Sequence, residues 1–196
     1  GSRDEALEEL FEVVLYIDSA ASLDVGAKVR YKGFDIGSVK SKKLEGGKAL
    51  LALAMKEEYR DLIKKDTLFW VEGFEAGLAG VKNPSSAVFG GYIALLPGVS
   101  KEESELFYAL STSPSPRLYE NGLRIVLKGG RKSSLDSGSP IYYRQVQIGE
   151  IIEAKLAKDS ASVEFLVFIE PCFAYLVREN SIFYNATALG FDVSLF

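Results

Sequence analysis

The sequence predicts an all-β protein made of two tandem small β-barrels, of which the second is expected to be truncated. Three observations support this fold class. A segment near the N-terminus recurs in the second half of the chain, short stretches alternate apolar and polar side chains, and glycine-containing turns separate these stretches. Roughly six short strands in a domain of about 100 residues favour a barrel, because closure removes exposed sheet edges.

The internal repeat has a constant offset of 112 residues over its first part. Between 11–40 and 123–152, nine of thirty positions are identical. Farther along the chain the offset becomes 114. The two additional residues fall where 45–47 and 158–160 indicate hairpin turns, and a duplicated domain tolerates insertions at turns. We therefore expect the two halves to share one fold.

Each copy begins with a strand, because Val13, Leu15 and Ile17 alternate with other side chains at a period of two. Glycine-containing turns and continuous apolar runs predict the later strands. Tyr59 and Leu62 share one face at helical spacing, which indicates a short helix. The expected elements, given for the first and then the second copy, are a strand (11–17; 123–127), a turn (Gly26; Gly138), two strands around a tight turn at Gly33 or Gln145 (28–39; 140–151), an apolar strand (49–55; 163–169), a short helix (57–65; 171–179) and a closing strand (67–71; 181–185).

The expected organisation has four segments. Residues 1–10 form a leader that begins with the scar of a cleaved tag, Gly1-Ser2, and 11–110 form the first barrel. Residues 111–121 form a linker rich in serine and proline. Residues 122–196 form a second barrel whose C-terminal strand is missing, because the repeat ends before its counterpart of 90–98.

The composition excludes several classes of protein. The chain has 196 residues, 23 Lys and Arg, 27 Asp and Glu, and a net charge of −4, which disfavours binding to nucleic acid. It has no histidine, which removes the usual general base and most zinc sites. Its one cysteine, Cys172, rules out an intrachain disulfide and is interpreted as a small buried side chain. We expect no catalytic, metal-binding or cofactor-binding residues.

The repeated motifs resemble a known family. The first copy carries S-L-D-V-G at 22–26, V-R-Y-K-G-F-D-I-G-S-V at 29–39 and G-G-Y-I-A-L-L-P-G at 90–98, and the second carries S-L-D-S-G at 134–138. This pattern resembles the MCE (mammalian cell entry) domain, and its duplication is similar to the tandem, paraquat-inducible protein B-like branch of that family. The resemblance implies a seven-stranded barrel and six-fold rings with a central pore. It also implies a role in carrying lipids across the periplasm of Gram-negative bacteria.

The loop 74–89 is the candidate functional segment. It carries glycine, proline and serine, yet it also carries apolar side chains that a merely solvated loop does not need. The resemblance implies that the corresponding loop lines the pore of the ring. The candidate pore-lining and lipid-contacting residues are therefore Leu78, Val81, Val88 and Phe89. Packing of these side chains back into the barrel remains an alternative, and 188–196 is the matching stretch of the second copy.

Other notable residues have structural interpretations. Gly37 and Gly149 are expected where backbones approach closely, and Tyr31 and Tyr143 are expected in the core. The lysine and arginine residues concentrated in 28–43 are interpreted as a solvated strand face. Contact of this face with anionic headgroups is disfavoured because the second copy does not repeat the charges.

The resemblance implies a non-enzymatic module of a periplasmic lipid-transport assembly between the inner and outer membranes. The expected partners are a phospholipid or other lipid, further copies in a hexameric ring and inner-membrane proteins. The parent protein is expected to be anchored in the inner membrane by a segment outside this sequence. The alternative is a β-repeat adhesion or ligand-binding module at the cell surface, and an enzyme that uses carboxylates alone is a third, weaker interpretation.

Overall fold

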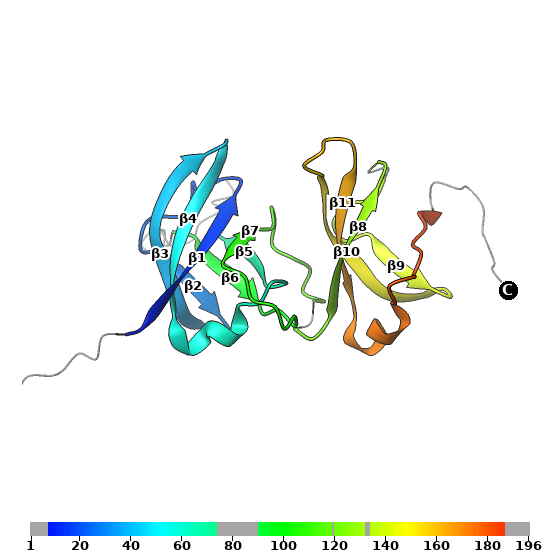
Figure 1. The fold of residues 1–196 in the computed structure, drawn as a ribbon, viewed down its shortest axis with the longest axis horizontal. Coiled ribbons are helices and arrows are strands. Elements are labelled where there is room, and N and C mark those ends of the chain that lie inside the picture. The colour runs from blue at the N-terminus through cyan, green and yellow to red at the C-terminus, as the bar shows by residue number, and fades with distance from the viewer. Residues whose placement is uncertain (1–7, 74–89, 119, 132–133, 187–196) are drawn as a thin grey trace, which may run out of the picture. The chain divides into compact units, whose positions relative to one another are not determined.

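The computed structural model describes residues 8–73, 90–118, 120–131 and 134–186. The chain divides into two compact units, Gly1–Pro114 and Ser115–Phe196, which we call unit 1 and unit 2. Nearly every regular element is a strand, so the predicted all-β class is confirmed (Figure 1). None of the helices in the described ranges is long and apolar enough to span a membrane.

Among its described residues, unit 1 contains seven strands and one 3-10 helix, which are β1 (Leu10–Ile17), β2 (Lys28–Tyr31), β3 (Phe34–Glu45), β4 (Lys48–Lys56), η1 (Glu57–Leu62), β5 (Leu68–Glu72), β6 (Tyr92–Leu96) and β7 (Leu106–Tyr108). The strands form one sheet in the order β5-β6-β2-β3-β4-β1-β7. The two end strands meet, because the Leu110 amide donates a hydrogen bond of 2.8 Å to the carbonyl of Phe69 in β5. Unit 1 is therefore a nearly closed barrel.

Side chains from alternate strand positions fill the interior of unit 1. Val13 and Leu15 of β1 and Leu53 of β4 are fully buried, and the predicted alternation of β1 is confirmed. Phe69 packs against Phe107 with 4.9 Å between the ring centroids. A small barrel filled in this way is a packed core and not a channel.

Unit 2 contains four strands and one 3-10 helix among the residues that the structure describes, which are β8 (Leu123–Gly129), β9 (Pro140–Tyr143), β10 (Val146–Leu156), β11 (Val163–Ile169) and η3 (Pro171–Leu176). Their order, β8-β11-β10-β9, matches β1-β4-β3-β2 of unit 1. The pairing also matches, because Val39 faces Leu53 in unit 1 and Ile151 faces Val167 in unit 2. Both units thus contain the same four-stranded arrangement.

The repeated glycines occupy equivalent strained or crowded positions. Gly26 and Gly138 have φ values of 90° and 84°, a region that glycine adopts more readily than other residues. A Cβ atom on Gly37 would lie 2.7 Å from the carbonyl oxygen of Ala54, and one on Gly149 would overlap the backbone of β11. The prediction that these glycines allow turns and close backbone approach is confirmed.

The β-hairpin between β3 and β4 differs from its counterpart in length, as predicted. In unit 1 the turn contains Gly46 and Gly47, both with positive φ. In unit 2 the longer connection, 157–162, is closed by Asp159, whose carboxylate accepts hydrogen bonds from the amides of Ala161 and Ser162 at 2.9 and 3.1 Å. These backbone hydrogen bonds lower the pKa of the Asp159 carboxyl. The strand pairing on either side of this connection is unchanged.

The predicted closing strand at 181–185 is wrong, because these residues form no strand. In unit 1 the equivalent strand β5 is held by its ladder with β6. At the repeat offset of 114, the counterpart of β6 would fall beyond residue 196. A strand needs a partner for its backbone groups, so the local sequence alone does not make 181–185 extended in a sheet.

The predicted short helices are present in a shorter and tighter form. Helices expected at 57–65 and 171–179 are the single 3-10 segments η1 and η3. Thr67 ends the first of these, since its hydroxyl donates a hydrogen bond of 2.8 Å to the Leu62 carbonyl and accepts one of 2.8 Å from the Lys64 amide.

Two predictions of burial need correction. Cys172, expected to be buried, is exposed, because the side chains of η3 that pack on the core belong to Phe173 and Leu176. Tyr31 is partly buried against the core of unit 1, as expected, whereas Tyr143 is 45% exposed. The difference follows from β6, which lies beside β2 in unit 1 and has no counterpart beside β9 among the described residues.

The tight turns at Gly33 and Gln145 lead to a stability prediction. Lys32 and Gly33 have φ values of 50° and 83°, and Arg144 and Gln145 have values of 48° and 66°, as in a type I′ turn. Replacing Gln145 by glycine should raise the stability of unit 2 by about 1 kcal/mol, because the left-handed region is unfavourable for a residue with a Cβ atom. Hydrogen exchange of the β10 and β11 amides in the whole chain measures this change.

The matched control is Gly33→Gln, which should destabilise unit 1 by a similar amount and leave exchange in β10 and β11 unchanged. Faster exchange in unit 2 after Gln145→Gly would contradict the assignment of this turn.

Candidate functional site

One rim of the unit 1 barrel carries the long connection between β5 and β6. Glu72 pairs with Tyr92 across this antiparallel ladder, so the described residues that flank 74–89 leave the sheet side by side. A β-hairpin loop usually has about 2–5 residues, whereas this connection extends from Gly73 to Gly91. The barrel therefore presents an unusually long segment at a single rim.

The base of this segment is held by Ser22, which lies between β1 and β2. The Gly91 amide donates a hydrogen bond of 2.7 Å to the Ser22 carbonyl. A Cβ atom on Gly91 would lie 2.9 Å from the Ser22 hydroxyl oxygen, closer than such atoms normally approach. The next residue, Leu23, is fully buried and so anchors Ser22 to the core. The β6 end of the connection therefore starts from a fixed position.

Glu72 holds the β5 end of the connection. Its carboxylate oxygen Oε1 accepts a hydrogen bond of 2.6 Å from Trp70 Nε1 and one of 2.8 Å from the Ser113 hydroxyl. The contacts between Glu72 and Ser113 and between Ser22 and Gly91 were not apparent from the sequence. Each joins residues that are far apart in the chain and that meet only when the barrel closes. The only local signal was the glycine pair at 90–91.

The candidate pore-lining residues Leu78, Val81, Val88 and Phe89 lie outside the described residues. The same holds for the matching stretch of the second copy, 188–196, of which no residue is described. The structure places the two stems from which the first segment starts.

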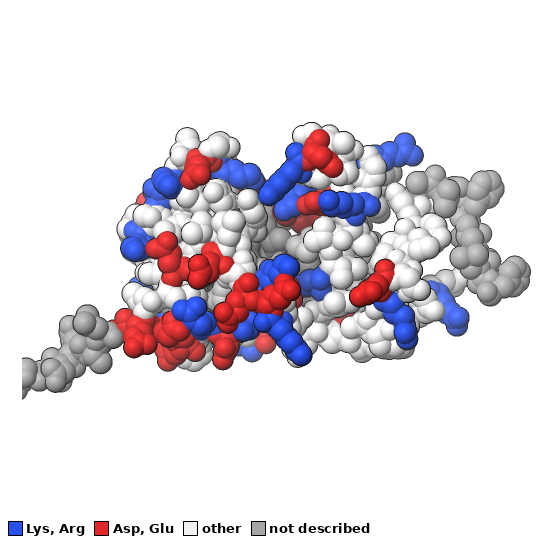
Figure 2. Space-filling model, in the orientation of Figure 1, with Lys and Arg blue, Asp and Glu red and all other residues white. Residues whose placement is uncertain are grey.

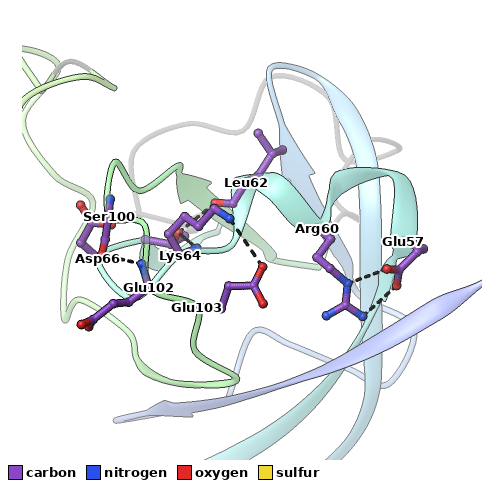
Figure 3. A network of polar contacts seen from close by, with 9 residues as sticks. Glu57, Arg60, Leu62, Lys64, Asp66, Ser100, Glu102 and Glu103 are labelled. Atoms are coloured by element: carbon purple, nitrogen blue, oxygen red, sulfur yellow. Dashed lines mark hydrogen bonds and ion pairs between the residues drawn. The ribbon is translucent and has the colours of Figure 1, made fainter.

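The opposite end of the unit 1 barrel carries a network of polar contacts (Figure 3). The Asp66 carboxylate accepts hydrogen bonds from the amides of Val99 and Ser100 at 3.0 and 2.9 Å. Lys65 pairs with Glu102 at 2.7 Å, and this hydrogen bond lowers the pKa of the Glu102 carboxyl and raises the pKa of Lys65. The network ties the segment after η1 to the crossover between β6 and β7.

A groove of about 400 Å³ lies beside this network. Arg60 lines it, with its guanidinium 4.2 Å from the centre of the Phe11 ring and paired with Glu57. The hydrogen bond from Arg60 lowers the pKa of the Glu57 carboxyl. Ile63 and Leu106 contribute apolar surface, and the remaining lining residues are Glu103, Ser104 and Glu105. The groove thus combines an apolar floor with a mainly acidic rim.

The basic residues of 28–43 lie at the surface, as the sequence indicated. Several pair with carboxylates of the same unit, including Arg30 with Asp35 at 2.8 Å and Lys40 with Glu12 at 3.4 Å. Figure 2 shows that positive and negative side chains are interspersed on the visible surface of unit 1. Within the described ranges, no group of His, Cys, Asp and Glu is arranged to hold a metal ion.

Comparison with known proteins identifies both repeats. Residues 11–98 and 121–188 match the sequence model of a family described as MlaD protein. The chain is 33% identical over 169 residues to a protein of Escherichia coli (strain K12) named "Lipophilic envelope-spanning tunnel protein B", a match that covers 85% of this chain and 19% of that protein. It is 29% identical over 188 residues to a "Probable intermembrane transport protein" of Haemophilus influenzae, which covers 94% of this chain and 21% of that protein.

The chain thus spans about a fifth of the length of the curated relatives it matches. The two matched segments coincide with the sequence repeat and together cover most of the chain. The strand order and register found in both units agree with this duplication. The chain therefore belongs to the MlaD family of MCE-domain proteins, as a tandem of two such domains.

Proposed function

We propose that this chain is a non-enzymatic module of a periplasmic assembly that moves lipids between the inner and outer membranes. Copies of it form stacked hexameric rings, and the segment 74–89 lines an apolar central pore through Leu78, Val81, Val88 and Phe89. In this proposal 11–110 and 122–196 are the two ring-forming domains, joined by 111–121. Partner proteins in the inner membrane, and an anchor outside this sequence, complete the assembly.

The packed interior of unit 1 is the observation that carries the proposal. Leu15, Leu53 and Phe69 are fully buried inside the barrel, which leaves no path for an acyl chain through the barrel itself. A lipid must therefore travel along a surface outside the barrel. The long connection between β5 and β6, with its firmly held stems, is well suited to present such a surface.

The physical requirement is a continuous apolar lining. Moving an acyl chain from a membrane into water costs about 0.8 kcal/mol per CH₂ group. A ring of apolar loops around an axis can offset this cost without covalent chemistry. The names of the relatives, one a lipophilic tunnel protein and one a probable intermembrane transport protein, support this role.

One observation favours the alternative, a surface module that binds a ligand or another cell. Phe34, Tyr142 and Tyr175 are 66%, 61% and 70% exposed, and exposed aromatic side chains often mark interaction sites. Under this alternative, lipid should not contact the segment 74–89.

Photocrosslinking distinguishes the two functions. A photoreactive amino acid at position 89, irradiated with vesicles of phosphatidylethanolamine and phosphatidylglycerol, should form crosslinks to phospholipid. The matched control is the same amino acid at position 44, because Leu44 is an apolar residue that is 81% exposed on a strand. Equal crosslinking at the two positions, or none at either, would count against lipid transport.

A further inference from the structure

Two exposed surfaces recur at the same end of each unit. We define the turn face as the exposed side chains on and beside the tight β2–β3 or β9–β10 turn, which are Lys28, Arg30, Lys32 and Phe34 in unit 1 and Pro140, Tyr142, Arg144 and Val146 in unit 2. We define the helix face as the exposed side chains of the 3-10 helix and the adjoining segment, which are Glu58, Asp61 and Glu105 in unit 1 and Pro171, Cys172 and Tyr175 in unit 2.

The two faces lie on different flanks of the unit 1 barrel. The turn face belongs to β2 and β3, whereas η1 follows β4 and its groove is lined by Phe11 of β1 and Leu106 of β7. In the strand order, β4 lies between β3 and β1. On the other side of the barrel, β5 and β6 lie between β7 and β2. The two faces of one barrel are therefore directed to different neighbours.

In unit 1 the two faces carry opposite charge. The turn face has three cations, and Arg30 forms an ion pair with Asp35 at 2.8 Å while the Lys32 ammonium lies 5.3 Å from the centre of the Tyr31 ring. The face ends in Phe34, which is 66% exposed. On the helix face, Glu58 and Asp61 form no ion pair with another described residue, whereas the negative charge of Glu105 contributes to raising the pKa of Arg60. Figure 2 shows many carboxylates, with lysine and arginine side chains among them, at the lower edge of unit 1, where η1 lies in Figure 1.

In unit 2 both faces carry less charge, and Arg144, at the position of Lys32, is the one cation that the defined turn face keeps. The turn face has Pro140 and Tyr142 at the positions of Lys28 and Arg30, and Tyr142 is 61% exposed. The helix face has an exposed cysteine at the position of Glu58 and Tyr175, 70% exposed, at that of Asp61. The chemistry of one face has thus changed in step with that of the other.

We propose that the turn face of each unit binds the helix face of the same unit in a second copy of this chain. The contact is mainly ionic between neighbouring copies of unit 1 and mainly apolar between neighbouring copies of unit 2. Phe34 then lies against the apolar floor of the groove formed by Phe11, Ile63 and Leu106. This inference rests on the ring assembly proposed above and assigns its interface.

The joint change of the turn face and the helix face between the two units indicates that both faces bind a second copy of this chain. A lipid or an unrelated partner could bind either face, but it would not cause both faces of one unit to change together. A head-to-tail contact between two different surfaces is also the kind that closes into a ring. The mismatch between a charged and an apolar face disfavours pairing of unit 1 with unit 2, because burying unpaired charges against apolar groups is costly. The two faces therefore specify that unit 1 of one copy contacts unit 1 of the next copy, and that unit 2 contacts unit 2.

Disulfide trapping tests the interface with single-cysteine chains in a Cys172→Ser background. Phe34→Cys mixed with Asp61→Cys, under mild oxidation with copper phenanthroline, should give about tenfold more mixed disulfide than Leu44→Cys with Asp61→Cys, a factor that corresponds to about 1.4 kcal/mol. Leu44 is the matched control because it is 81% exposed and lies near the far end of β3. Val146→Cys with Tyr175→Cys should also be trapped, whereas Phe34→Cys with Tyr175→Cys should match the control.

Charge reversal provides an independent measurement. Glu58→Lys in the Asp61→Cys chain should reduce trapping, and Lys28→Glu in the Phe34→Cys chain should restore it. Equal trapping of all pairs, or a predominance of Phe34→Cys with itself, would overturn the interface. Lipid crosslinking from position 89 without specific trapping would reject this interface alone. Specific trapping without lipid crosslinking would reject the transport role and retain the interface.

Discussion

Replacing Phe89 or Leu78 by aspartate should abolish lipid transfer and leave the barrel folded. In a six-fold ring each change introduces six carboxylates into the proposed path. Transferring even one ionised carboxylate into an apolar environment costs several kcal/mol, so transfer should fall by about 100-fold or more. Transfer of a fluorescent phosphatidylethanolamine between vesicles measures the effect, and thermal unfolding should change by less than about 0.5 kcal/mol.

The matched control is Leu44→Asp, which places the same charge on an exposed strand position outside the proposed path. It should reduce neither transfer nor stability. If Phe89→Asp instead unfolds unit 1 by several kcal/mol, the side chain packs in the barrel and the pore assignment is wrong. That outcome would favour the alternative in which the apolar side chains of 74–89 return to the core.

Replacing Phe69 by alanine should destabilise unit 1 by about 3–5 kcal/mol, since a fully buried aromatic side chain is lost and a cavity remains. Phe69 is 0% exposed and packs on Phe107, and its carbonyl accepts the hydrogen bond from Leu110 that joins the two end strands. The loss should therefore be accompanied by faster hydrogen exchange at β7. Urea unfolding of the whole chain, followed at Trp70, measures the change in stability.

Phe34→Ala is the control for this prediction, because Phe34 is the same residue type in the same unit but is 66% exposed. Its effect on stability should stay within about 0.5 kcal/mol. If Phe69→Ala and Phe34→Ala lowered the free energy of unfolding by similar amounts, the assignment of Phe69 to the core that stabilises the barrel would be wrong.

The sequence predicted the repeated part of the fold well, because its signals are local. Alternation in β1, the glycines at 26 and 37 and the two hairpin turns each depend on a few consecutive residues, and each occurs twice. The prediction failed at 181–185, where a strand depends on a partner supplied by another part of the domain. It also failed at Cys172, because the pattern of η3 did not reveal which side packs on the core.

The sequence indicated which segment to consider as the candidate site, but not the contacts that hold the residues on either side of it. The composition of 74–89 and the family resemblance pointed to it, but the contacts of Ser22 with Gly91 and of Glu72 with Ser113 join residues far apart in the sequence. Such contacts follow from closure of the barrel and from no local pattern. The correlated change of the turn and helix faces was likewise visible only once the structure showed which residues of each unit are exposed.

The hairpin connection 157–162 offers a practical route to labelled protein. Unit 2 accommodates a longer connection than unit 1 at this point, yet Ile151 still faces Val167 just as Val39 faces Leu53. The pairing of the two strands therefore does not depend on the length of the connection between them. An epitope tag or a small fluorescent reporter inserted in the connection 157–162 should extend into solvent while the strand register is kept. Such an insertion would report where the protein resides in the living cell without altering either terminus.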